Sequence, residues 1–92
     1  MAKPNQTPKN DLPEQGEQNK WDAKGYQDGC RFAFEEADYD DLAAIYRAGR
    51  IPANWDIFRA EILNTYVGFP SFDFQAYAAG FARACLKFFE KL

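Results

Sequence analysis

The chain has 92 residues, carries a formal net charge of −3 and contains no histidine. Its length suits one small domain, and its nine Phe, five Tyr and two Trp residues supply the bulk that a small core needs. The lack of histidine excludes Ser-His-Asp and Cys-His catalysis and the usual His-containing zinc sites. We therefore expect a non-enzymatic protein with no cofactor and no metal, and the acidic pI of about 4.8 makes nucleic acid a disfavoured partner.

The sequence also bears on cellular location. No stretch without charged residues is long enough to span a bilayer, and the N-terminus lacks the apolar segment of a secretory signal. We expect a cytoplasmic protein without a membrane interaction. In a reducing cytosol, Cys30 and Cys85 are expected to be free, buried thiols.

The N-terminal segment differs in composition from the rest of the chain. Residues 1–19 contain three prolines and, after the start, Leu12 as the one sizeable apolar residue. Such a segment cannot bury enough apolar surface to offset the entropy of ordering. We predict a disordered arm over 1–19 and a single helical domain over 20–92.

A first helix is predicted over residues 20–36. Tyr26, Gly29 and Ala33 recur at positions i, i+3 and i+7 and so share one helix face with Cys30. Glycine weakens a helix by about 1 kcal/mol relative to Ala. We therefore expect Gly29 to lie where another backbone comes close.

A short second helix is predicted over residues 41–48. Asp40 is a suitable N-cap, because its side chain can accept a hydrogen bond from the first turn. Gly49 follows the last apolar position, and Pro52 prevents the helix from continuing.

A third helix is predicted over residues 54–67, with Asn54 as its N-cap and Gly68 and Pro70 as its stop. Its apolar positions follow helical spacing. The stripe consists of Trp55, Phe58, Ile62 and Tyr66. Two flanking residues, Ile57 and Leu63, widen it.

A fourth helix is predicted over residues 71–91, capped by Ser71. It is apolar on most sides, and such a helix lies at the centre of a bundle or is covered by a second subunit. A homodimer through this helix is therefore one expectation. The fold class that we predict is all-α, a compact bundle of four helices of unequal length, for which an up-and-down arrangement is one candidate.

The pattern Y-x-x-G-x-x-x-A occurs three times. On a helix, the small residues of this pattern form a shallow groove that lets a second helix approach closely. We predict that two copies mark a crossing of the first and last helices, with a ligand or peptide groove as the alternative. The third copy, residues 46–53, contains Pro52 and is read as a helix stop. The crossing residues are Tyr26, Gly29, Ala33, Tyr77, Gly80 and Ala84.

Two short segments resemble another family. GYQDG at residues 25–29 and YAAGFARA at residues 77–84 are similar to segments of the ribosome modulation factor family of bacterial hibernation proteins. The resemblance covers about a dozen positions and implies association with ribosomes. This chain lacks the strongly basic character that rRNA binding in that family requires, and its two segments lie farther apart.

The densest charge feature is EEADYDD, residues 35–41. Acids near the C-terminal end of a helix are placed unfavourably for the helix dipole, which suggests that the acidic corner has a use. The alternatives are a solvated corner between two helices, docking of a basic partner, or a cation site, although an EF-hand pattern is absent. The candidate partner-binding residues are Glu35, Glu36, Asp38, Asp40 and Asp41, together with Phe89 on the last helix.

These observations favour a small protein-binding module, such as an adaptor, an inhibitor or a regulatory subunit. Docking would use the acidic corner, an apolar patch on the last helix, or both. The first alternative is a nucleic-acid- or ribosome-associated regulatory factor. A further alternative is a protein that binds a small apolar ligand in an aromatic cavity between the first and last helices.

Overall fold

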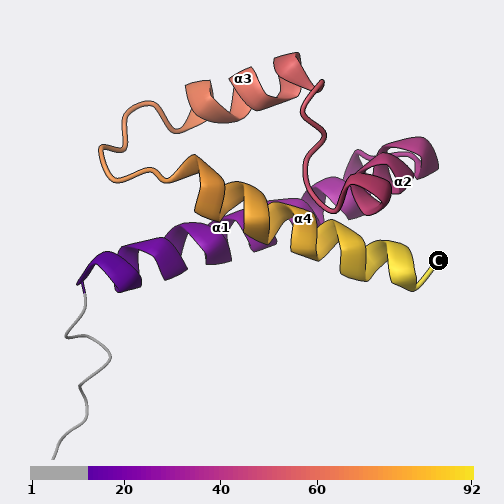
Figure 1. Ribbon diagram of the computed structural model, residues 1–92, viewed down its shortest axis with the longest axis horizontal. Coiled ribbons are helices and arrows are strands. Elements are labelled where there is room, and N and C mark those ends of the chain that lie inside the picture. The colour runs from indigo at the N-terminus through magenta and orange to yellow at the C-terminus, as the bar shows by residue number, and fades with distance from the viewer. Residues whose placement is uncertain (1–12) are drawn as a thin grey trace, which may run out of the picture.

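The computed structural model describes the backbone of residues 13–92 and the side chains of residues 20–92. It contains four helices, and residues 13–92 form no strand, which confirms the predicted all-α fold (Figure 1). The elements in chain order are α1 (Pro13–Glu35), α2 (Tyr39–Ala48), α3 (Asp56–Thr65) and α4 (Phe74–Glu90).

Helix α1 begins earlier than predicted, at Pro13 rather than near residue 20. Proline suits the first turn of a helix, because its φ angle is already helical and an N–H at that position would have no partner within the helix. Part of the predicted disordered arm, residues 13–19, is therefore helical. The rest of that arm, residues 1–12, lies outside the described residues.

Helices α1 and α4 run side by side and in the same direction (Figure 1). Helix α2 is short and lies near the end of α1, while α3 runs back toward the start of α4. This differs from the up-and-down arrangement, in which the first and fourth helices are antiparallel. The reason is the length of α2, since ten residues span only about 15 Å and do not bring the chain back along α1.

The contact between α1 and α4 is made by backbone, at three glycines. A Cβ at Gly25 would overlap the Tyr77 carbonyl group, and one at Gly80 would lie 2.9 Å from the carbonyl carbon of Asp22. A Cβ at Gly29 would lie 2.6 Å from the carbonyl oxygen of Phe81. Because even a methyl group does not fit at these positions, glycine is required for the two helices to lie this close. We call this contact the α1–α4 seam.

Helix α3, in contrast, is held against the other helices by large side chains. The ring of Phe58 lies 5.2 Å from that of Phe32 on α1 and 5.5 Å from that of Phe81 on α4. The predicted flanking residues Ile57 and Leu63 do not join this core, because their side chains are exposed. The stripe of α3 is therefore narrower than predicted.

The cap of α2 corrects one sequence prediction. Asp38, not Asp40, is the N-cap residue, and it forms a capping box with Asp41. The backbone N–H of Asp41 donates to Asp38 Oδ1 over 2.9 Å, and that of Asp38 donates to Asp41 Oδ2 over 3.2 Å. Reciprocal bonds of this kind satisfy two backbone donors at once, which explains why the helix starts two residues early. Gly49 ends α2 at φ 71°, as predicted.

The caps of α3 and α4 also differ from the predictions. No side chain caps α3, which begins at Asp56 rather than Asn54 and ends at Thr65, before Gly68. Helix α4 is capped by Asp73, which accepts a hydrogen bond from the N–H of Ala76.

Ser71 has a different role from the predicted cap. Its Oγ accepts a hydrogen bond from the Trp21 indole. That contact ties the segment before α4 to α1.

The two cysteines lie in different environments. Both are free, and Cys85 is buried in the α1–α4 seam, where its thiol donates weakly to the Gly29 carbonyl. Burial raises the pKa of the Cys85 thiol to about 12. Cys30 is exposed, which corrects the prediction that it is buried. No helix among the described residues is long and apolar enough to pass through a membrane.

Candidate functional site

The predicted acidic corner lies beside a cluster of aromatic rings, where α1 ends, α2 begins and α4 ends (Figure 1). The Phe34 ring lies 6.5 Å from that of Phe88. The Phe89 ring lies 5.4 Å from Tyr39 and 4.8 Å from Tyr46. We call this surface the acidic aromatic end, and it comprises Phe34, Glu35, Glu36, Asp38, Tyr39, Asp40, Asp41, Tyr46, Phe88 and Phe89.

Three of these rings are exposed. Phe34 is 77%, Tyr39 63% and Tyr46 49% exposed, whereas Phe89, whose ring lies close to both tyrosines, is half-buried. Phe34 lies against Phe88, and the two tyrosines lie against Phe89, the next residue of α4. Exposed aromatic side chains are frequent in protein-binding surfaces. Of the predicted partner-binding residues, Phe89 therefore supports the surface from below, and Phe34 and Tyr39, which the sequence did not single out, form its outer part.

The five acids of the corner divide into two groups. Asp38 and Asp41 are engaged in the capping box of α2. Glu35, Glu36 and Asp40 are exposed. Within residues 20–92, none of the five forms an ion pair. The solvent-exposed charge of the corner is therefore carried chiefly by Glu35, Glu36 and Asp40.

The acidic corner does not resemble a cation site. In the part of the chain that the structure describes, no three Asp, Glu, Cys or His side chains gather closely enough to hold a metal ion. This arrangement favours the alternatives of a solvated corner or a docking surface.

The residues predicted to mark a helix crossing lie along the α1–α4 seam. Ala33, Tyr77 and Ala84 are buried, and a Cβ at Gly29 would lie 3.0 Å from that of Ala84. Gly80 does not lie opposite Gly29. It faces Asp22 and Tyr26, which lie about two turns and one turn earlier on α1.

The same seam is closed at its rim. The Arg83 guanidinium forms two hydrogen bonds with the Asp22 carboxylate, of 2.7 and 3.1 Å, and lies over the Tyr26 ring. Because the two backbones already fill this space, the seam does not offer a ligand groove.

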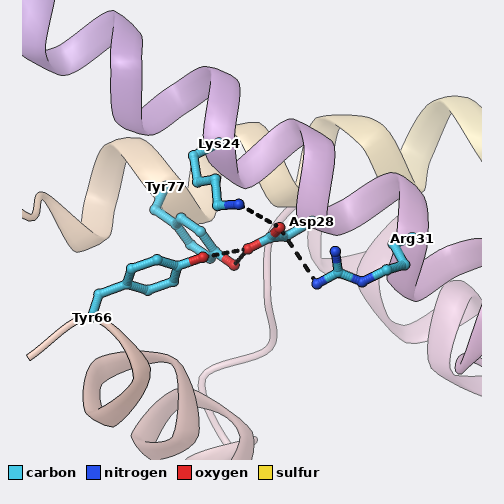
Figure 2. Close-up of polar contacts among 5 residues, drawn as sticks. All are labelled: Lys24, Asp28, Arg31, Tyr66 and Tyr77. Atoms are coloured by element: carbon cyan, nitrogen blue, oxygen red, sulfur yellow. Dashed lines mark hydrogen bonds and ion pairs between the residues drawn. The ribbon is translucent and has the colours of Figure 1, made fainter.

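A buried carboxylate, Asp28, lies on α1 beside the seam (Figure 2). Its Oδ2 accepts hydrogen bonds from the hydroxyl groups of Tyr66 and Tyr77, over 2.6 and 2.5 Å. Lys24 Nζ and Arg31 Nη2 each lie 3.5 Å from Oδ1. One carboxylate thus joins α1, the start of α4 and the segment that follows α3.

The pKa of Asp28 follows from these contacts. Burial alone would raise it, but the hydroxyl groups of Tyr66 and Tyr77 and the charges of Lys24 and Arg31 together hold the pKa below its ordinary value. The same burial, together with the bond to Asp28, raises the pKa values of Tyr66 and Tyr77. At neutral pH the carboxylate is ionised and both phenols are protonated, as the hydrogen bonds require.

Sequence reasoning did not find Asp28. One local signal was present, since Lys24 and Arg31 lie four residues before and three residues after it, on the same helix face. The two tyrosines that satisfy the carboxylate are 38 and 49 positions away, and no pattern in the sequence links them to it.

An aromatic cavity lies next to Asp28. It is bordered by α1 and α4, as the ligand-binding alternative supposed, and also by α3. It has a volume of about 230 Å³, and Phe32, Phe58 and Phe81 contribute to its walls. Sites for small molecules are usually about 300 Å³ or larger. Asp28 Oδ2 accepts hydrogen bonds from both tyrosines. Oδ1 accepts no hydrogen bond from the described residues but lies beside the charges of Lys24 and Arg31. Because these charges come from this chain, we interpret the cluster as structural.

Comparisons of the chain with protein-family models, with curated proteins and with solved structures find no match. The resemblance to the ribosome modulation factor family therefore rests on its two short segments alone. Both segments lie in the α1–α4 seam, where their small residues have a packing role.

Proposed function

We propose that the protein is a non-enzymatic binding module that docks another protein through the acidic aromatic end. The observation that carries this proposal is the exposure of two large rings, Phe34 and Tyr39, next to acids that have no ion-pair partner within residues 20–92. Water-exposed rings of this size gain free energy when a partner covers them, by about 25 cal/mol for each Å² of apolar surface. A partner that covers this surface should present basic side chains around an apolar centre.

Contacts within the chain order parts of this surface before a partner binds. Phe89 supports Tyr39 and Tyr46 from below, and the capping box fixes the start of α2. A surface that is already ordered before binding loses less conformational entropy when a partner docks. This arrangement supports docking in preference to a merely solvated corner.

Affinity capture from the native host, followed by mass spectrometry, tests the proposal. We would compare the parent with two variants that leave the capping box intact. One is the triple variant Glu35→Lys, Glu36→Lys and Asp40→Lys, and the other is Phe34→Ser. Both should lose the same captured protein, because one removes charge complementarity and the other removes apolar contact.

The control is Glu61→Lys, which makes one charge reversal of the same kind at an exposed position of α3. It should keep the partner. Circular dichroism must show that all variants remain folded. If folded variants of both kinds capture the same proteins as the parent, the acidic aromatic end is not the docking surface.

A further inference from the structure

A second open surface lies along α4, before the acidic aromatic end. It is a groove of about 470 Å³, bounded by α4, by the segment after α2 and by one residue of α3. Its floor contains three alanines of α4, Ala78, Ala79 and Ala82. These side chains are so short that a helix laid along the groove could approach the α4 backbone closely.

The rim of this groove is basic. Arg50, Arg59 and Arg83 all border it, and no Asp or Glu of residues 20–92 does. Arg83 is paired with Asp22, but Arg50 and Arg59 form no ion pair with any side chain of residues 20–92. The protein has a net charge of −3, but these arginines make the surface at the groove locally positive.

Arg59 is held against an aromatic ring at the edge of the groove. Its guanidinium lies over the Phe74 ring, with Cζ 4.9 Å from the ring centroid. A guanidinium stacked by its face keeps N–H groups along its edge, and that edge matches the two oxygens of a carboxylate. The ring holds the cation in place before a ligand arrives.

From this geometry we propose that the groove binds an acidic amphipathic helix of a partner protein. The helix lays an apolar face on the alanine floor and directs Asp or Glu side chains to Arg50 and Arg59. The α4 residues that border the groove run from Gln75 to Leu86, or about three helical turns. No residue that lines the groove belongs to the acidic aromatic end. The groove favours an acidic partner, whereas the acidic aromatic end favours a basic one.

Two other occupants fit the charges less well. In a symmetric homodimer through this face of α4, the groove of each copy would meet the same surface of the other. No Asp or Glu of residues 20–92 lines the groove to pair with Arg50 and Arg59 there. A nucleic acid would meet a protein that is acidic overall, and the floor is made of alanines rather than of exposed rings on which bases stack.

The test uses the ¹⁵N-labelled full chain and two synthetic peptides. Both are helix-forming, with one apolar face of Ala and Leu, and they differ only in carrying Glu or Lys on the flanking positions. Titration is followed by amide chemical shifts. The Glu peptide should shift the amides of Arg50, Arg59 and Ala79, and the Lys peptide should not shift these amides.

The variant Arg50→Glu with Arg59→Glu should reverse this preference. It should bind the Glu peptide at least about tenfold more weakly, a change of about 1.4 kcal/mol, and bind the Lys peptide in the groove. The control Lys87→Glu with Lys91→Glu changes the same charge near the end of α4, outside the groove, and should keep the preference for the Glu peptide.

Several results would overturn the proposal. These are a lack of groove shifts with the Glu peptide at millimolar concentration, equal groove shifts with both peptides, or tighter groove binding of a single-stranded RNA 16-mer. A homodimer in sedimentation equilibrium that Ala79→Glu dissociates would also contradict it, because the groove would then hold a second copy.

Discussion

Helices α1 and α4 meet in two different ways along their length. In the seam, glycines bring the two backbones into direct contact. Toward the ends of the same helices, the contact is made by rings such as Phe34 and Phe88, and Phe34 is largely exposed. The first arrangement fills all the space between the helices, while the second leaves apolar surface for a partner. The seam of this helix pair thus stabilises the fold, and its far end is the part proposed to bind a partner.

The largest expected effect comes from filling the seam. Gly80→Leu places a side chain where even a Cβ would press on the backbone of Asp22, so we expect a loss of at least about 3 kcal/mol or failure to fold. Gly68→Ala is the matched control, because nothing lies within 4 Å of a Cβ at Gly68. Thermal unfolding followed by circular dichroism measures both. A Gly80→Leu protein that melts with the parent would refute the close contact.

The next effect concerns the carboxylate beside the seam. Asp28→Asn removes the charge that Tyr66 and Tyr77 hydrogen-bond, and we expect it to cost about 2 kcal/mol, or about 10 °C in Tm. The control is Glu90→Gln, which neutralises an exposed carboxylate on α4. It should change the free energy of unfolding little.

The same variant has a defined pH dependence. Because folding lowers the pKa of Asp28 from 3.8, the ionised carboxylate stabilises the fold above about pH 4, and this stabilisation is lost as the pH falls through the folded-state pKa. The difference in unfolding free energy between parent and Asp28→Asn should therefore shrink as the pH falls below about 4. A difference that grows in acid would mean that the pKa is raised.

Much of the fold could be predicted from the sequence, because it depends on local signals. Helical spacing of apolar residues predicts four helices. Gly49 is predictable as a stop because it follows the last apolar position of its helix and Pro52 prevents continuation. Cap positions were less predictable, since Asp38, Asp40 and Asp41 are chemically alike and only the backbone path decides which one accepts the bond. The parallel direction of α1 and α4 depends on how the short middle helices pack. Local sequence patterns do not predict this direction.

A smaller effect on stability should distinguish Asp38, which caps α2, from Asp40, which does not. Asp38→Ala removes the N-cap of α2 and should cost about 1 kcal/mol. Asp40→Ala should stay within about 0.5 kcal/mol of the parent, because Asp40 is exposed and makes no side-chain bond to the cap. Chemical denaturation compares the two. Equal losses would mean that the capping box does not determine the stability of α2.

The smallest expected change in stability is that of Phe34→Ser. Phe34 is 77% exposed, so the free energy of unfolding should change by no more than about 0.5 kcal/mol, although capture of the partner should be lost. A large destabilisation would instead place Phe34 among the residues that hold the fold together. Urea denaturation distinguishes the two results.

The candidate site was predictable in part for a similar reason. Its acids are adjacent in the sequence, so a simple charge count located them. The exposure of Phe34 and Tyr39 could not be predicted, because the sequence places Phe34 beside the apolar face of its helix and does not show where α4 stops covering it. The role of Asp28 depends on two tyrosines that are distant in sequence.

Hydrogen exchange of the free protein, followed by mass spectrometry, tests most directly the division between a tight seam and an open end. Amides of α1 and α4 that lie in the seam, residues 22–30 and 77–85, should exchange most slowly, because their exchange requires the largest unfolding event. Amides of residues 34–41 and of α3 should exchange faster. Equal protection throughout, or faster exchange in the seam than in α3, would contradict the account.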